Sequence, residues 1–231
     1  MELITNKISL DLKKLIKLEF HKNFNLITEK NSRINHVNIF HKDWGCTLQS
    51  SGKIISILQN DYSIDPNCIV SLGFINSQIN SYNQHFHIDY EGKTETYFIP
   101  LIDLTDVNGT EYVEFINREY NIDILEELVE ITDKFINRDQ ITKYFNSKNI
   151  TSYKFKYLNG AKWSMVKMPY YLFHRGQSNQ GTKDRTMFQI IISKTSNCVV
   201  SPEIKVMDSE LDENNFQVQK LLTSRKLHTS T

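Results

Sequence analysis

The spacing of apolar residues predicts a helix near the start of the chain. Within residues 7–20, Ile8, Leu12, Leu15, Ile16 and Phe20 recur mostly at intervals of three or four, with lysines between them. This is the pattern of a helix with one apolar face. Residues 53–59 (KIISILQ) are also rich in apolar residues, but so short a run fits a helix or a strand equally well.

From residue 68 onward the pattern becomes that of strands. Short segments alternate between apolar and polar residues, or are continuously apolar and rich in Ile and Val, and turn residues separate them. The segments with this character are 68–79, 83–90, 94–104, 110–116, 152–158, 161–168 and 185–193. Asn108-Gly109 predicts a hairpin turn that joins 94–104 to 110–116, because Asn-Gly tolerates the positive φ angles of such turns.

These segments predict a mainly β protein with helices. A sandwich or barrel of the jelly-roll kind fits many short strands best. Apolar residues at roughly helical spacing predict one or two helices inserted at about 117–150. The chain has 231 residues and no internal repeat or linker-like run. We therefore expect one domain over 1–231, with its core at about 68–195 and a polar tail at about 207–231.

Composition narrows the possible partners and the compartment. Lys+Arg and Asp+Glu both total 27, so no net field favours nucleic acid, and we expect a small-molecule substrate instead. Cys46, Cys68 and Cys198 are scattered and form no CxxC pair, which favours free thiols in a reducing cytosol. Charges interrupt every apolar run. We therefore expect a cytoplasmic protein with no signal peptide and no membrane span.

The candidate chemistry lies in His87-Ile88-Asp89 and the distant His174. Side chains two apart on a strand share a face, so His87 and Asp89 project together. Two such ligands and one distant histidine form the set of a 2-His-1-carboxylate iron site, which leaves coordination positions open. Arg185 follows His174 by eleven residues at the start of a predicted strand, and a guanidinium grips a carboxylate with two hydrogen bonds. The triplet alone also occurs by chance, since structural histidines and solvated aspartates are common.

The order of these residues resembles a known family. His87-x-Asp89 is followed by Asn108-Gly109-Thr110 and then by His174-Arg175-Gly176, with Asn179 and Arg185 after them. This order is similar to that of the Fe(II)/2-oxoglutarate-dependent oxygenases, in particular the phytanoyl-CoA dioxygenase-like subgroup. The resemblance covers roughly residues 70–195. The subgroup usually continues after Asn-Gly with a Pro-Gly-Ser-His-like stretch, whereas this chain has TEYVEFINREY.

The resemblance implies a fold, a cofactor set and a reaction. It implies a double-stranded β-helix (jelly-roll or cupin-like) core, Fe(II) bound by His87, Asp89 and His174, and 2-oxoglutarate with its distal carboxylate on Arg185. It further implies the use of O2 to oxidise a small or medium organic substrate, with release of succinate and CO2. Related halogenases lack the carboxylate ligand, so the presence of Asp89 favours hydroxylation or another oxidation over halogenation.

The roles of four further residues stay open. Tyr97 and Gln189 lie on strands expected to line the barrel, where each could hydrogen-bond 2-oxoglutarate or pack as an ordinary side chain. Thr110 and Arg175 have the same two interpretations.

Two other functions also remain possible. His85-x-His87 with Glu91 matches the first metal motif of cupins, HxHxxxE, with His174 as a fourth ligand. The glycines that flank that motif are missing, and a cupin site would not employ Arg185. One alternative is therefore a cupin-type metal enzyme that does not use 2-oxoglutarate. The other is a non-catalytic jelly-roll binding protein.

Overall fold

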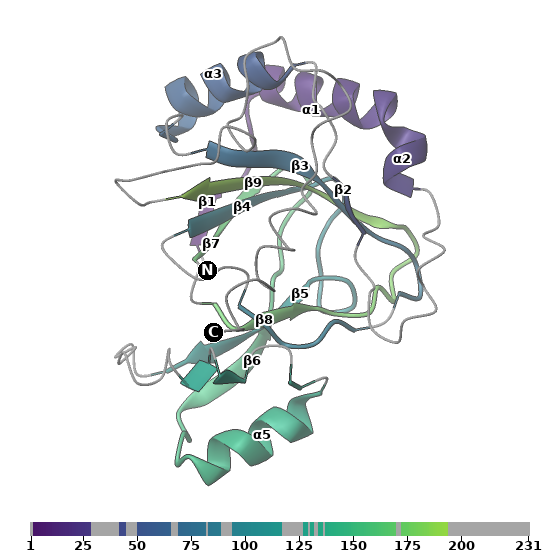
Figure 1. Ribbon diagram of the computed structural model, residues 1–231. Coiled ribbons are helices and arrows are strands. Elements are labelled where there is room, and N and C mark those ends of the chain that lie inside the picture. The colour runs from purple at the N-terminus through teal and green to yellow at the C-terminus, as the bar shows by residue number, and fades with distance from the viewer. Residues whose placement is uncertain are drawn as a thin grey trace, which may run out of the picture.

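The computed structural model contains two antiparallel β-sheets with helices outside them (Figure 1). It describes residues 2–28, 42–44, 50–65, 69–81, 83–88, 94–116, 127–128, 130–131, 134–135, 137–169 and 172–193. Asp89, Glu91 and the tail expected at 207–231 lie outside these ranges. The expectation of a single domain over 1–231 therefore stays a prediction.

The large sheet has six strands. In spatial order they are β1 (Glu2–Thr5), β7 (Met165–Pro169), β4 (Thr94–Pro100), β9 (Arg185–Ser193), β3 (Ile69–Ser77) and β2 (Lys42–Trp44). All neighbours pair antiparallel. The long central strands explain why the segments 68–79, 94–104 and 185–193 carry so many apolar residues.

The small sheet has three strands and lies below the large one in Figure 1. Its order is β6 (Tyr153–Tyr157), β5 (Thr110–Phe115) and β8 (His174–Gly176). A bridge between His87 and His174 adds the segment 83–88 beside β8. From β3 onward the chain crosses repeatedly from one sheet to the other. Residues far apart in sequence therefore meet in the space between the sheets.

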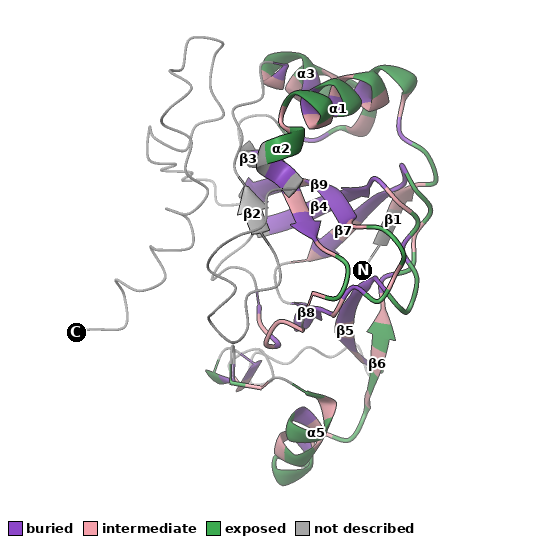
Figure 2. Ribbon diagram, turned by 90° about the vertical axis from the view of Figure 1, so that its right-hand side faces the viewer, coloured by how far each residue is buried: buried purple, intermediate pink, exposed green. Residues whose placement is uncertain are grey.

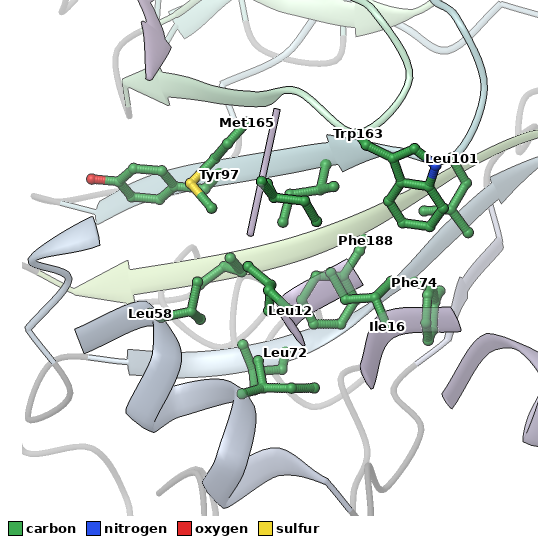
Figure 3. Close-up of a cluster of buried hydrophobic side chains, with 14 of the residues drawn as sticks. Leu12, Ile16, Leu58, Leu72, Phe74, Tyr97, Leu101, Trp163, Met165 and Phe188 are labelled. Carbon is green, nitrogen blue, oxygen red and sulfur yellow. The ribbon is translucent and has the colours of Figure 1, made fainter. Parts of the chain in front are cut away.

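Three helices cover the outer face of the large sheet. They are α1 (Leu10–Lys22), α2 (Phe24–Thr28) and α3 (Ser51–Tyr62). The Ser9 side chain accepts a hydrogen bond from the Leu12 amide and so caps the start of α1. Leu12 and Leu58 pack with Phe74 and Phe188 of the sheet (Figure 3). The helix expected at 7–20 is thus confirmed, and the segment 53–59 is helical.

The helix α5 (Arg138–Ser147) lies under the small sheet, on the side away from the large one (Figure 1). Asn137 and Gln140 form a capping box at its start. Phe145 packs with Val113 and Phe173 of the sheet. α5 is a helical part of the insertion expected at 117–150. None of the helices in the described ranges has the length and apolar character needed to span a bilayer.

Strand alternation sorts neighbouring residues onto opposite faces. On β9, Phe188 belongs to the cluster under the helices. Met187 belongs to a separate cluster that also contains Phe98, Met168 and Leu172, and this cluster lies between the two sheets. Figure 2 shows that the large sheet is mostly buried, whereas β6 carries exposed positions.

Two expectations about strands are wrong. The strand expected at 83–90 is reduced, within residues 83–88, to the single bridge at His87. Asn108-Gly109 does not close a hairpin, because β4 pairs with β7 and β9 while β5 pairs with β6 and β8. Asn108 has no positive φ. Its side chain instead accepts from the Thr105 amide at 2.7 Å and forms a corner between the sheets.

Candidate active site

The two sequence-predicted histidines lie side by side. The His87 amide donates to the His174 carbonyl at 2.7 Å, and the His174 amide donates back to the His87 carbonyl at 2.9 Å. The two ring centroids are 4.5 Å apart, with 52° between the ring planes. The backbone bridge therefore brings the two rings together at the edge of the small sheet.

Both rings have the same proton arrangement. Nδ1 of His87 lies 2.7 Å from the His85 carbonyl oxygen, and Nδ1 of His174 lies 2.9 Å from the Leu172 carbonyl oxygen. A carbonyl oxygen only accepts, so each Nδ1 donates and each Nε2 carries the lone pair. Neutral histidines that donate through one nitrogen are typical metal ligands through the other. His85 thus orients His87 through its backbone carbonyl.

The third expected ligand is Asp89. Asp89 lies outside the described ranges, and within those ranges no group of three or more His, Cys, Asp and Glu side chains gathers around one point. Asp89 as a ligand stays a prediction. The described pair supplies two adjacent imidazole donors, which fits two of the three positions of an iron site.

Arg185 is a fully buried cation on β9. Its Nη1 donates to the carbonyls of Asn108 and Gly109 at 2.6 and 3.2 Å, and its Nη2 donates to Ser77 Oγ at 2.7 Å. Burial lowers the pKa of Arg185 to about 10, so the guanidinium keeps its charge at neutral pH. The side chain shares a face with Met187 and therefore points between the sheets.

The corner at Gly109 connects Arg185 to the histidines. In the small sheet Thr110 pairs with Gly176, and Tyr112 pairs with His174. Gly109 directly precedes β5 and lies three residues from Tyr112, which is roughly 10 Å at about 3.3 Å per residue of extended chain. The guanidinium and the histidine pair thus face the same space from the two sheets.

The remaining candidates divide by strand face. Gln189 is half-buried and lies on the same face of β9 as Arg185, and Thr110 is buried at the start of β5. Tyr97 does not line the space between the sheets. Its ring belongs to the cluster under the helices (Figure 3), and its hydroxyl donates to Glu95 at 3.0 Å. Strand alternation gives the inward position on β4 to Phe98 instead.

We call the side of the small sheet that faces the large sheet its front face, and the side that faces α5 its back face. On the back face, Glu111 is fully buried and accepts hydrogen bonds from Arg175 at 2.6 Å and from Arg138 of α5. The Arg175 guanidinium lies over the Phe86 ring, 4.6 Å from its centroid. Arg175 therefore points away from the histidine rings.

Sequence reasoning did not single out Glu111, Arg138 or Tyr112. The alternation in TEYVEF shows that Glu111 and Tyr112 face opposite sides. The partners of Glu111 are 27 and 64 residues away in the chain. Strand register identifies Arg175 and the packing of α5 on the sheet identifies Arg138, and no local pattern carries either.

Comparison with solved structures identifies the fold. AviO1 from Streptomyces viridochromogenes Tue57 matches with a TM-score of 0.50 and 9% identity, over 83% of this chain and 88% of that one. SnoK, described as a non-haem α-ketoglutarate-dependent carbocyclase from nogalamycin biosynthesis, matches with 0.50 and 10% identity, over 82% and 78%. EvdMO1 matches with 0.51 and 10% identity, over 83% and 46%.

The chain has the fold of the non-haem 2-oxoglutarate-dependent oxygenases. No protein-family model matches the sequence, and no curated protein matches it. Within the oxygenase fold, assignment to the phytanoyl-CoA dioxygenase-like subgroup stays a prediction. The histidine pair and Arg185 of this chain are the described side chains on which a functional argument can rest.

Proposed function

We propose that the protein is a non-haem Fe(II)- and 2-oxoglutarate-dependent oxygenase that hydroxylates a small or medium organic substrate. The observation that carries the proposal is the histidine pair. His87 and His174 lie with their rings 4.5 Å apart, and the Nδ1 of each donates to a backbone carbonyl. Both Nε2 atoms are therefore set to bind one metal ion, and Asp89, two residues after His87, is the proposed third ligand.

The path of the chain supports the same function. From β3 to β9 the strands fall in the order large, small, large, small, small, large, small and large, when the segment 83–88 is counted with the small sheet. We interpret this order as a double-stranded β-helix. In that arrangement the segment 83–88, β8 and β9 converge, which brings His87, His174 and Arg185 to one space.

Arg185 is the proposed anchor for the distal carboxylate of 2-oxoglutarate. A guanidinium buried away from water stabilises an anion far more strongly than an exposed one does. The carbonyls of Asn108 and Gly109 and the hydroxyl of Ser77 hold its Nη atoms in place. Gln189, on the same face of β9, and Thr110, next to Gly109, are proposed to contact the co-substrate. Tyr97 is not included because it lies on the other face.

The proposed reaction uses one O2 for each substrate and co-substrate. A substrate C–H becomes C–OH, and 2-oxoglutarate becomes succinate and CO2, so that one oxygen atom enters each organic product. Bound iron would supply the activation of O2. The protein would hold 2-oxoglutarate through Arg185 and keep water from the reacting atoms with the apolar cluster between the sheets.

The direct test measures binding and turnover with matched variants. Anaerobic full-length protein should bind Fe(II) and then 2-oxoglutarate, and O2 should give succinate. His174→Ala should lose the metal, whereas Arg185→Gln should keep the metal but lose 2-oxoglutarate. Protein that folds and binds metal yet neither binds nor consumes 2-oxoglutarate would contradict the proposal.

The same variants separate the two alternatives. A cupin-type enzyme that does not use 2-oxoglutarate would keep its activity in Arg185→Gln. A non-catalytic binding protein would hold no iron, manganese or zinc after anaerobic reconstitution.

A further inference from the structure

The segment 83–88 carries His87 beside β8 without being a regular strand. Within it, His87 bridges to His174. Nearer the start of the segment, the Gln84 amide donates to the Gly176 carbonyl and the Gln84 side chain accepts from the Gly176 amide, both at 2.8 Å. A single bridge fixes two backbones at one residue. Side-chain contacts therefore also decide how the segment is oriented against β8, and with it the two histidine rings.

Three side chains on the back face join the two segments that carry the histidines. Phe86, directly before His87, is fully buried, and its ring stacks on that of Phe173 with 5.5 Å between centroids and 30° between planes. The Arg175 guanidinium lies over the same Phe86 ring, 4.6 Å from its centroid. Phe173 and Arg175 are the chain neighbours of His174. The residue next to one histidine thus contacts the residues on both sides of the other.

Glu111, directly opposite on β5, holds the Arg175 guanidinium in this position. Nε and Nη2 of Arg175 both lie 2.6 Å from Oε2 of Glu111. The other oxygen of Glu111 accepts from Arg138 of α5, so the carboxylate is fixed from two sides. Two hydrogen bonds to one planar group fix its orientation. The Arg175 side chain is only 9% exposed, and a cation over a ring is attracted more strongly there than in water.

We propose that Arg175 is a positioning residue for the metal site. From the back face it holds Phe86 against β8, and this contact sets the spacing of the His87 and His174 rings on the front face. The inference rests on the proposed function and adds to it a residue that acts through others. It gives Arg175 a role other than a hydrogen bond to 2-oxoglutarate, because its guanidinium points away from the space between the sheets.

The first measurement is made on metal-free, full-length protein. The amides of His87 and His174 donate to each other's carbonyls, so their hydrogen exchange, followed by NMR, reports how often the pair opens. Arg175→Lys keeps a positive charge beside Glu111 but loses the planar group over Phe86. Both histidine amides should exchange roughly 2- to 30-fold faster, the range expected for loss of one cation–ring contact. The amides of β9 serve as the internal reference and should not change.

The second measurement is an anaerobic titration with Co(II), whose visible absorption reports both the affinity and the arrangement of the ligands. Groups that orient metal-binding histidines by direct hydrogen bonds typically contribute 10- to 100-fold to metal affinity. Arg175 acts through the backbone, so we expect the lower end of this range. Arg175→Lys should weaken Co(II) binding by about 10-fold and change the absorption of the bound ion.

Arg138→Lys is the matched control. It changes the other arginine on the same carboxylate and also keeps the charge. The Arg138 guanidinium lies over Phe155 of β6, 5.0 Å from the ring centroid, rather than over the residue next to His87. Exchange of the two histidine amides and Co(II) affinity should therefore match those of the wild type.

Phe86→Leu tests the same contact from the side of the ring. If Arg175 acts through Phe86, the double variant with Arg175→Lys should bind Co(II) no more weakly than Phe86→Leu alone, because both changes remove one interaction. Phe86→Leu also carries the test if Arg175→Lys does not fold. Its histidine amides should then exchange faster than those of Arg138→Lys.

Three results would overturn the positioning role. Equal changes in Arg138→Lys and Arg175→Lys would mean that the arginines only stabilise the sheet. Unchanged amide exchange and Co(II) affinity in Arg175→Lys, or additive losses in the double variant, would show that the contact with Phe86 does not set the histidine pair. Wild-type protein that binds no metal contradicts the proposed function itself, whereas exchange of the histidine amides still decides whether Arg175 holds the pair.

Discussion

The two faces of the small sheet differ in the burial of their polar residues, although the same strands supply both faces. On the back face, Glu111 is buried and accepts hydrogen bonds from two arginines. On the front face, Glu114 is 43% exposed and pairs with Lys156. Successive side chains of a strand project to opposite faces, so a shift of the register by one residue would exchange the residues on the two faces. The back face therefore joins the sheet to α5, whereas this ion pair on the front face is accessible to solvent.

The buried group on the back face also connects separate parts of the chain. Arg175 follows His174 directly, and Arg138 is the first residue of α5. Both guanidiniums pair with the carboxylate of Glu111. Docking of α5 and placement of His174 are therefore linked through one side chain.

The largest expected effect comes from removing that carboxylate. Glu111→Gln leaves the Arg175 guanidinium, whose side chain is only 9% exposed, without its counter-charge. Loss of one partner of a buried ion pair costs about 3–5 kcal/mol in the free energy of unfolding. Urea denaturation followed by circular dichroism measures this loss.

Glu114→Gln is the matched control on the front face. It breaks an ion pair of two half-exposed side chains, and screening by solvent leaves such pairs with little effect on the free energy of unfolding. Equal losses of stability in the two variants would contradict the division between a structural back face and an open front face. A large loss of stability in Glu114→Gln alone would show that the front face, and not the back face, is the structural one.

The sequence predicts this division only in part. Alternation in TEYVEF correctly separates Glu111 from Tyr112, and the spacing of His87, His174 and Arg185 suggested the residues that the fold brings to one space. Neither pattern contains the register that sets Tyr112 opposite His174 or Arg175 opposite Glu111. Register depends on contacts between distant segments, and these form only when both sheets assemble.

Two local signals were misleading for physical reasons. Asn108-Gly109 has the composition of a hairpin turn, but the Asn108 side chain binds the Thr105 amide and turns the chain into the other sheet. Tyr97 lies in a strand buried on both faces, where an apolar run gives no sign of which face points inward. The helices on one side of the large sheet decide that question.

The second prediction concerns the corner that joins Arg185 to the front face. A Cβ added at Gly109 would lie 2.3 Å from the Leu158 carbonyl oxygen and 2.7 Å from that of Thr105. Both are backbone atoms, so Gly109→Ala must displace the chain. We expect a loss of roughly 1–3 kcal/mol in the free energy of unfolding. Because the Gly109 carbonyl accepts from Arg185, 2-oxoglutarate binding should weaken as well.

Gly52→Ala provides the control for this change. Gly52 lies in α3, and nothing lies within 4 Å of an added Cβ. Alanine is the better helix former, so this variant should gain up to about 1 kcal/mol. Thermal melts and titrations with 2-oxoglutarate measure both variants. A Gly109→Ala protein with normal stability and normal binding would show that the corner does not position Arg185.

The smallest expected effect tests how α5 is held on the back-face side. The Tyr144 hydroxyl donates to Glu127 at 2.7 Å, and Lys148 lies 2.9 Å from the same carboxylate. These hydrogen bonds lower the pKa of Glu127, chiefly through Tyr144. Burial and the Glu127 carboxylate raise the pKa of Tyr144 to about 12.

The two pKa shifts predict that the Tyr144–Glu127 hydrogen bond stabilises the protein at intermediate pH and loses this effect at low and at high pH. A carboxyl with a lowered pKa in the folded state contributes fully above the ordinary pKa of a glutamate, about 4.3, and loses its contribution as the pH falls further and protonates it. A phenol with a raised pKa contributes fully below about pH 10 and loses its contribution as the pH rises towards 12. Tyr144→Phe should lower stability between these limits and converge with the wild type outside them. A constant difference from pH 3 to pH 11 would show that the tyrosine acts through packing alone, and the front face should bind its ligands equally well in either case.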